Sequence, residues 1–373
     1  YQQDGWAGRQ NRLNELPLQG NGQLFMTDAI TSDTLYAHSF STLFQEWLNT
    51  EEATQRMRAF ENVFQLPMPT KPVKVEVCLR DMRQELLVKN TFKIDPTDIL
   101  IKRLVPKDRP RTQMLLKNGT LKECIDVVIV SEGYTASDTL AFYEKAKEAC
   151  DALFSHEPFK TMRAHFNVTA VALTSKESGV SIPGKNIWKQ TALGSQFNTF
   201  YSDRYLTTLN IRSIYDQLAG IPFEHIIILA NTSNYGGGGI YNSYTLSMTE
   251  HKDFRPVVVH EFGHSFAGLA DEYFYDDQYE QYYFSDVEPW EQNITTLKDF
   301  NSKWKDMLPK GCPIPTLPTN KSVDKIGVYE GAGYMSKGAY RGYQECRMKI
   351  NAWPEFCPVC QRAITNLIKF YTH

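Results

Sequence analysis

The chain lacks any hydrophobic run long enough to cross a membrane. A membrane-spanning helix needs about 20 apolar residues in succession, whereas apolar segments such as residues 125–130 have only the length of a strand. Net charge is also nearly absent, because 40 basic and 43 acidic side chains leave a formal charge of −3. Since phosphate recognition needs a basic surface, the sequence predicts neither a membrane span nor a nucleic-acid partner.

Cysteine is scarce as well, with seven among 373 residues, which argues against a fold built on disulfides. The chain shows no internal repeat and no low-complexity tract apart from four glycines at 236–239. A length of 373 residues with 42% hydrophobic residues allows two domains, each with its own core. The sequence starts at Tyr1 without a signal-like segment, as expected of a mature exported protein or of a shortened chain. Composition therefore predicts a soluble, globular, exported protein.

The N-terminal part, residues 1–110, is predicted to be an accessory domain of the antiparallel β-sandwich type. Its segments are short and several alternate between apolar and polar residues, as half-buried strands do. Residues 45–58 are polar and indicate a loop or a short helix, and the basic, proline-containing residues 105–111 indicate a linker. The predicted strands are residues 35–42, 59–66, 73–79 and 86–94.

Residues 111–373 are predicted to form the catalytic domain, because strands and helices alternate there. Residues 124–130 are continuously apolar, which favours a strand buried on both faces. The β-α-β order that follows favours right-handed crossovers and a mostly parallel mixed sheet. The predicted elements are strands at 124–130, 166–173 and 225–229 and helices at 139–154 and 205–218.

One motif carries chemistry. Residues 260–264 read His-Glu-Phe-Gly-His, and on a helix positions i and i+4 lie on one face. His260 and His264 can therefore offer two imidazoles to one metal ion, with Glu261 placed to take a proton from an activated water. Such a pattern also occurs by chance, as a buried helix with two hydrogen-bonded histidines. The apolar residues around the motif favour the zinc site, with Zn²⁺ as cofactor.

A catalytic zinc ion takes three protein ligands and leaves one position open. Many zinc peptidases place the third ligand six residues after the second histidine, which here is Ala270 and cannot bind a metal. The glycine at 268 ends the helix, and a turn with one extra residue would deliver Asp271. We therefore predict Asp271 as the third ligand, with Glu272 or a remote residue as alternatives.

The segment from His260 to Tyr273 resembles the active-site signature of the bacterial IgA-peptidase family of zinc metallopeptidases. Other blocks are similar to the family as well, so the resemblance covers roughly residues 115–370, and the β-rich N-terminal part fits the family's accessory domain more loosely. These blocks are residues 130–135, 166–168, 177–179, 234–237, 288–305, 329–332, 340–348 and 356–360.

The resemblance implies a metzincin-like zincin catalytic domain and an exported zinc endopeptidase. Its natural substrate would be a polypeptide, with a host extracellular glycoprotein as one candidate. The resemblance also implies that Met348 forms a methionine turn beneath the zinc ligands, and Met335 is the alternative. Tyr340 is a weaker candidate for stabilising the oxyanion of the transition state.

Two further segments have open interpretations. Residues 241–248 after the glycine run are either an edge strand that pairs with an extended substrate or part of a surface loop. Cys346, Cys357 and Cys360 either form a disulfide, from the first to one of the other two, or stay as thiols. A four-thiolate zinc site that adds Cys312 matches the usual paired spacing poorly.

Three functions of different classes fit these features. The first is the zinc endopeptidase. The second is a binding protein that keeps the fold without turnover and grips a host glycoprotein or glycan. The third is a zinc hydrolase that acts on non-peptide amides or on cell-wall peptides. The intact Glu261 favours an enzyme, because a pure binding protein has no use for a general base beside two metal ligands.

Overall fold

The computed structural model describes all residues except 2–4, 104–108 and 277–281, so most of the predicted linker lies outside the described residues. The N-terminal part forms one antiparallel sheet with the strand order β2-β1-β3-β4. Its elements are β1 (Gly22–Asp28), β2 (Thr34–Phe40), α1 (Leu43–Trp47), β3 (Val73–Arg80) and β4 (Leu86–Ile94).

The β-rich, antiparallel character predicted for this part is confirmed, but two details differ. Residues 59–66, predicted as a strand, have no regular secondary structure, and Phe60, Val63 and Phe64 instead pack as side chains against neighbouring cores. The sheet is a single layer within the described chain, because nearly all of β4 is exposed and no second sheet covers it.

The central sheet has six strands in the order β5-β7-β6-β8-β10-β9. The four inner strands are parallel, and both edge strands are antiparallel to their neighbours, so the predicted mostly parallel mixed sheet is confirmed. The strands are β5 (Arg111–Leu116), β6 (Ile125–Glu132), β7 (Phe166–Ala172), β8 (His225–Ala230), β9 (Gly237–Ile240) and β10 (Tyr244–Met248).

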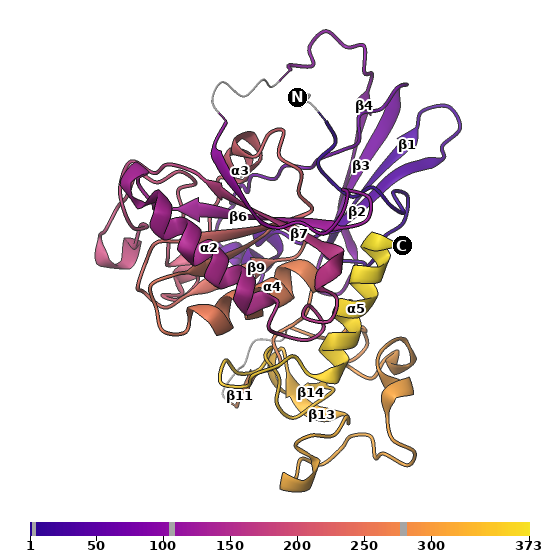
Figure 1. The fold of residues 1–373 in the computed structure, drawn as a ribbon. Helices are drawn as coiled ribbons and strands as arrows, with labels where there is room; N and C mark the ends of the chain where they lie inside the picture. The colour runs from indigo at the N-terminus through magenta and orange to yellow at the C-terminus, as the bar shows by residue number, and fades with distance from the viewer. Residues whose placement is uncertain (2–4, 104–108, 277–281) are drawn as a thin grey trace.

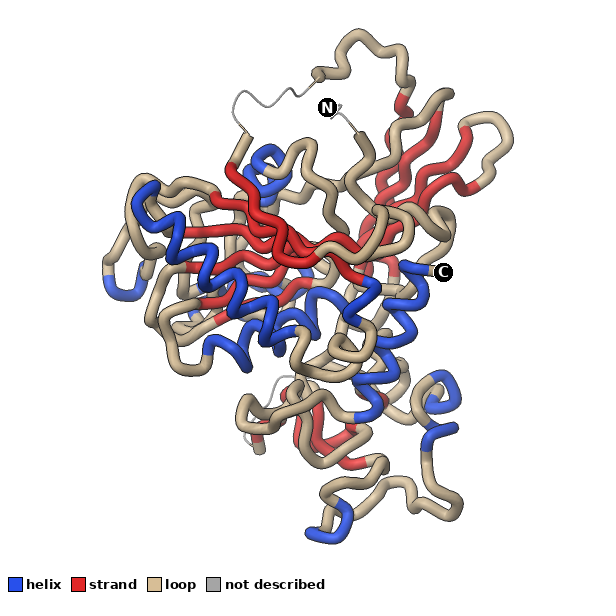
Figure 2. The backbone as a smooth tube through the Cα atoms, in the orientation of Figure 1, coloured by secondary structure: helices blue, strands red, loops and turns tan. Residues whose placement is uncertain are grey.

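Helices cover the two faces of this sheet unequally (Figures 1 and 2). On β6, Val127 and Ile129 pack into the core formed with α2, α4 and α5, whereas Val128 and Val130 pack toward α3 on the opposite face. Every residue of β6 is buried, as its continuous apolar sequence predicts. The helices are α2 (Thr139–Leu153), α3 (Ile211–Gln217), α4 (Phe254–Ala267) and α5 (Pro358–Thr372).

A third, small sheet lies beyond α4 and holds the chain that follows this helix. It is made of short segments that are far apart in sequence, and α5 runs from it toward the N-terminal sheet (Figure 1). Its strands are β11 (Phe274–Tyr275), β12 (Ile294–Thr295), β13 (Tyr329–Ala332) and β14 (Tyr334–Arg341). No helix within the described ranges is both long enough and apolar enough to cross a bilayer.

Candidate active site

The central helix α4 carries His260, Glu261 and His264 on the side that faces a cleft, and its other side is packed into the protein. Its apolar residues Val258, Val259, Phe262 and Phe266 lie in the main core. The helix ends at Gly268, whose φ of 56° lies in the left-handed region that favours glycine. The chain therefore turns sharply just after the second histidine.

The two histidine rings are held by backbone carbonyls. His260 Nδ1 lies 2.9 Å from the carbonyl oxygen of Arg347, and His264 Nδ1 lies 2.5 Å from that of Leu269. A carbonyl oxygen only accepts hydrogen bonds, so Nδ1 carries the proton in each ring. In the neutral imidazoles, each Nε2 atom then presents a lone pair.

Asp271 comes back toward these rings after the turn. Its Oδ1 atom lies 3.1 Å from His260 Nε2 and 3.3 Å from His264 Nε2, and the two Nε2 atoms are 3.0 Å apart. Its Oδ2 atom accepts a hydrogen bond from the hydroxyl of Tyr334. Burial raises the pKa of the Asp271 carboxyl group, but His264 and His260, when they are protonated, outweigh burial and lower this pKa.

These three atoms fit a tetrahedral metal ion. Three lone pairs facing one another within 3.3 Å repel unless a cation lies among them. Bonds of about 2.0 Å at tetrahedral angles would separate neighbouring ligand atoms by roughly 3.3 Å, close to the separations here. Asp271 Oδ1 is also buried without a hydrogen-bond partner within the described residues.

Glu272, the other carboxylate of the turn, points elsewhere. Its side chain is fully buried and lies next to Cys357 and Cys360, with Oε1 3.1 Å from Cys360 Sγ. The side chains of the adjacent residues Asp271 and Glu272 thus point to opposite sides of this extended segment. The backbone N–H of Glu272 donates to the carbonyl of Met348 and fixes that orientation.

Glu261 faces the glycine strand β9. A Cβ atom on Gly237 would lie 2.8 Å from Glu261 Oε1, and one on Gly239 would lie 2.2 Å from the Glu261 carbonyl oxygen. Glycine is thus required at these positions so that β9 can approach α4. Burial raises the pKa of Glu261, although both neighbouring histidines lower it.

The predicted edge strand at residues 241–248 is corrected by the sheet order. The edge is β9, the glycine run itself, whereas β10 lies one position further in. The glycine run was not predicted as a strand, and glycine has low strand propensity. Contacts decide the outcome here: α4 covers one face of β9, and Tyr205 and Leu206 lie close to Gly238 on the other.

A cleft of about 1230 Å³ opens over this group of residues. Its floor includes His260, Glu261, His264 and Asp271, and β9 lines one wall. The N-terminal part closes another wall through α1, where Glu46 accepts a hydrogen bond from Tyr205. Tyrosines line the cleft at 201, 205, 235, 241, 273, 275, 282, 283 and 334.

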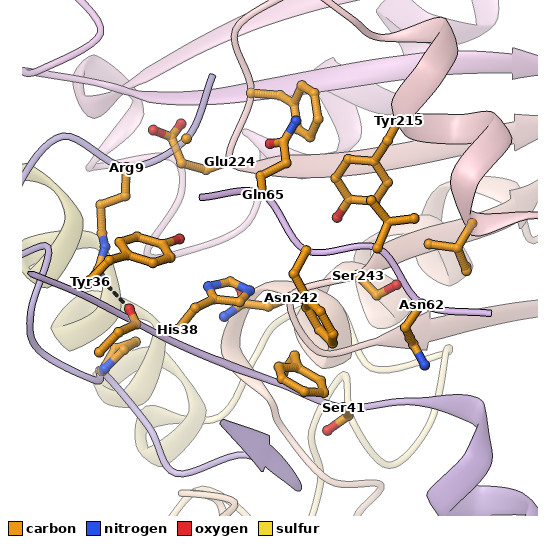
Figure 3. A pocket seen from close by; sticks show the side chains of 18 of the residues that line it. Arg9, Tyr36, His38, Ser41, Asn62, Gln65, Tyr215, Glu224, Asn242 and Ser243 are labelled. Carbon is orange, nitrogen blue, oxygen red and sulfur yellow. Dashed lines mark hydrogen bonds between the residues drawn. The ribbon is translucent and has the colours of Figure 1, made fainter. Parts of the chain in front are cut away.

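A second cavity, of about 60 Å³, lies where the N-terminal part meets the catalytic domain (Figure 3). Arg9 and His38 lie on one side, Glu224 and Tyr215 on the other, and Arg9 donates to the carbonyl of Ala37 at 2.8 Å. Burial and the nearby Arg9 lower the pKa of His38 to about 4. The cavity is too small for a peptide, so it is part of the packing between the two parts.

Met348, Met335 and Tyr340, the other candidates from the sequence, lie in different parts of the structure. Met348 is fully buried against α4, and a Cβ atom on Gly263 would lie 2.7 Å from its Sδ atom. Its alternative, Met335, lies in the small third sheet beside Tyr283. Tyr340 pairs within that sheet and does not line the cleft, so it is wrongly placed for an oxyanion.

Two residues that hold the turn, one of them fully buried, have no signal in the sequence. Asn293 accepts from the N–H of Ala270 and donates to its carbonyl, both at 2.8 Å, and it also donates to Glu272 Oε1 at 3.0 Å. The other residue is Tyr334, which donates to Asp271. Both lie in segments remote from the motif, and no local spacing reveals them.

A helix with two imidazoles and an adjacent carboxylate at the floor of an open cleft is the arrangement of a metallopeptidase. Comparison with known families agrees. The family described as IgA peptidase M64 matches residues 114–324 and 317–368, and the family described as peptidase M64 N-terminus matches residues 1–91. The chain belongs to the IgA peptidase M64 family, as its motifs predicted. No curated protein matches the chain in sequence.

Proposed function

We propose that this protein is an exported, zinc-dependent endopeptidase in which Glu261 is the general base. The observation that carries the proposal is the convergence of His260 Nε2, His264 Nε2 and Asp271 Oδ1 within 3.3 Å at the floor of the cleft. Two imidazoles and one carboxylate that leave an open side are the ligand set of catalytic zinc sites. These three residues are our proposed metal ligands.

The chain's own residues have separate tasks in the proposed reaction. When bound, zinc supplies Lewis-acid polarisation of the scissile carbonyl and lowers the pKa of a water molecule. The Glu261 carboxylate accepts the proton of the attacking water and passes it to the departing amine. The carbonyls of Arg347 and Leu269 keep the His260 and His264 rings in one tautomer during this step.

Substrate binding is proposed along β9. An extended peptide can add to the exposed edge of a sheet through main-chain hydrogen bonds. The edge strand β9 lines the cleft directly beside Glu261, and Gly237 at its start already pairs with residues 204–206, so a peptide would pair along the rest of the strand. An open cleft suits cleavage within a chain, so the substrate class is a polypeptide, with host extracellular glycoproteins as candidates.

The division into domains follows the same proposal. Residues 1–110 would be the accessory domain and residues 111–373 the catalytic domain. The accessory part contributes Glu46 to the cleft wall, and burial raises the pKa of this side chain to about 7. We propose that this wall limits which substrates can enter.

The test compares Glu261→Gln with the wild-type protein. The variant should keep its zinc, measured by elemental analysis, and lose about 10²–10⁴-fold in the rate of cleaving an unfolded protein substrate. Cleavage by Glu261→Gln at the wild-type rate would contradict the role of Glu261 as general base. Absence of cleavage by the wild-type protein, with zinc present at His260 and His264, would favour the binding-protein alternative.

A further inference from the structure

A second group of metal-binding side chains lies on the far side of Asp271 from the cleft. Glu272 follows α4, Cys346 lies in the loop after β14, and Cys357 and Cys360 are at the start of α5. All four are buried, with at most 1% of any of them exposed. One ligand atom from each lies within 4.8 Å of all the others.

The spacing of these atoms matches a tetrahedral site. Zinc–sulfur bonds of about 2.3 Å place neighbouring sulfur atoms roughly 3.8 Å apart, and sulfur and oxygen ligands roughly 3.5 Å apart. The Sγ atoms of Cys346 and Cys360 are 3.7 Å apart. Glu272 Oε1 lies 3.1 Å from Cys360 Sγ and 3.9 Å from Cys357 Sγ.

The Glu272 carboxylate independently indicates a cation. The side chain is completely buried, and its Oε2 atom has no hydrogen-bond partner among the residues described. Its Oε1 atom accepts a hydrogen bond from Asn293 at 3.0 Å and lies 3.1 Å from the Cys360 thiol, which also donates to it. A buried carboxylate with unsatisfied lone pairs is costly unless a positive charge lies beside it.

The surroundings of Cys346 are those of a metal-bound thiolate. The backbone N–H groups of Cys357 and Met348 point to its Sγ atom at 3.2 and 3.4 Å. Such N–H donors stabilise negative charge on sulfur and orient the ligand. The buried guanidinium of Arg341 interacts electrostatically with both Cys346 and Glu272 and offsets part of their charge.

The disulfide expected from the sequence is not formed, because all seven cysteines are free thiols. A disulfide would join two sulfur atoms at about 2.0 Å, well below the 3.7 Å between Cys346 and Cys360. It would also leave no cation beside Glu272 Oε2, which has no hydrogen-bond partner among the described residues. Cys312 is partly exposed and contacts Thr316 instead, so Glu272 takes the fourth position.

We infer that Cys346, Cys357, Cys360 and Glu272 bind a structural Zn²⁺ ion. Three thiols lose their protons on binding, and the four ligands close the coordination shell, so no position is left for a substrate or water. The site joins three segments that are distant in sequence. It is therefore a cross-link between the end of α4, the loop after β14 and the start of α5.

This cross-link would position the ligands of the cleft, a consequence that rests on the proposed function. Glu272 is bonded in sequence to Asp271, so a metal that fixes one carboxylate also fixes the direction of the other. Arg347, whose carbonyl holds His260, directly follows Cys346. The structural ion would thus hold two of the three proposed catalytic ligands through their neighbours.

Metal content of the full chain tests this inference. The wild-type protein should contain two zinc ions per chain, and His260→Ala/His264→Ala should retain one. After cobalt replaces zinc, that variant should show the strong near-ultraviolet absorption of thiolate–cobalt charge transfer, which histidine and carboxylate ligands cannot produce. A variant with no metal, or with cobalt that lacks this absorption, would overturn the inference.

The reciprocal variants are Cys357→Ser/Cys360→Ser and, as a milder change, Glu272→Gln. The cysteine variant should lose the charge-transfer absorption, and Glu272→Gln should weaken zinc binding at this site by about 10-fold or more. Cys312→Ser is the control and should keep both ions. If the double cysteine variant does not fold, thiol counting on the denatured, chelated wild-type protein decides: seven free thiols support the site, and a disulfide among the three cysteines overturns it.

The two proposals fail in different ways. A single zinc ion bound by thiolates, with no metal at His260 and His264, would contradict the proposed catalytic site and leave the structural site intact. A single zinc ion that is lost in His260→Ala/His264→Ala would contradict the structural site and leave the proposed catalytic site intact. Weaker zinc binding at the histidines in Glu272→Gln, by about 10-fold, would support the coupling of the two sites.

Discussion

Gly239→Ala tests how closely the edge strand must approach the catalytic helix. The added Cβ atom would lie 2.2 Å from the carbonyl oxygen of Glu261 and 2.8 Å from the Cβ atom of His264, whereas ordinary contact begins at 3.4 Å. Both obstacles belong to rigid parts of α4 and not to the ends of flexible side chains. Strand or helix must therefore shift by roughly 1 Å.

The size of the effect follows from that shift. Overpacking of this kind costs about 1–3 kcal/mol of unfolding free energy. A displacement of about 1 Å at the general base lowers catalysis by up to about 10²-fold. We expect kcat/KM for peptide cleavage to fall by about 10–100-fold, measured on the folded variant well below its melting temperature.

The matched control is Gly311→Ala. Gly311 has a φ of 77° and nothing within 4 Å of an added Cβ atom. The control should therefore lose about 1 kcal/mol through backbone strain alone and keep full activity. Wild-type stability together with wild-type kcat/KM in Gly239→Ala would refute the close approach of β9 to α4.

Three further predictions concern residues around the cleft and the domain contact. Tyr334→Phe removes the hydrogen bond to Asp271 and should weaken zinc binding about 10-fold in a chelator competition assay. Asn293→Ala removes three buried hydrogen bonds and should lower the unfolding free energy in urea by about 2–3 kcal/mol. The folded-state pKa of His38, about 4, lies below the ordinary 6.5, so stability should fall as the pH drops from 6.5 to 4. In urea titrations, His38→Gln should reduce this pH-dependent loss of unfolding free energy by roughly 2–3 kcal/mol. The control His373→Gln, at an exposed position, should leave the loss unchanged.

Much of the fold was predictable because its central strands depend on local sequence. The buried strands β6, β7 and β8 were located to within two residues, since each is a short segment rich in apolar residues. Helix α2 was predicted equally well from the helical spacing of its apolar residues. By contrast, β9 was missed, because three of its four residues are glycines and its strand conformation depends on α4 packing against it.

The candidate site shows the same division between local and distant determinants. The His260 to His264 spacing is a property of one helical turn and can be read from five letters. The choice of Asp271 over Glu272 depends on which side of an extended segment faces the helix. That choice is set by Asn293, 21 residues along the chain from Glu272, by Tyr334, 63 residues from Asp271, and by the loop that carries Cys346.

The grouping of the three cysteines with Glu272 was not predicted, for a similar reason. Cys357 and Cys360 form a recognisable pair at the start of a helix, but their partners are 11 to 88 residues distant. One of these partners is a glutamate that sequence reasoning had assigned to the catalytic turn. Three-dimensional proximity, not spacing, therefore identified the group.

The most direct test of the account is anomalous diffraction at the zinc absorption edge from crystals of the full chain. The account predicts a peak bonded to His260 Nε2, His264 Nε2 and Asp271, facing the cleft beside Glu261. A peak at the four buried ligands behind Asp271 would be expected in the same map. A protein that cleaves peptides with no metal peak at the two histidines would contradict the central claim.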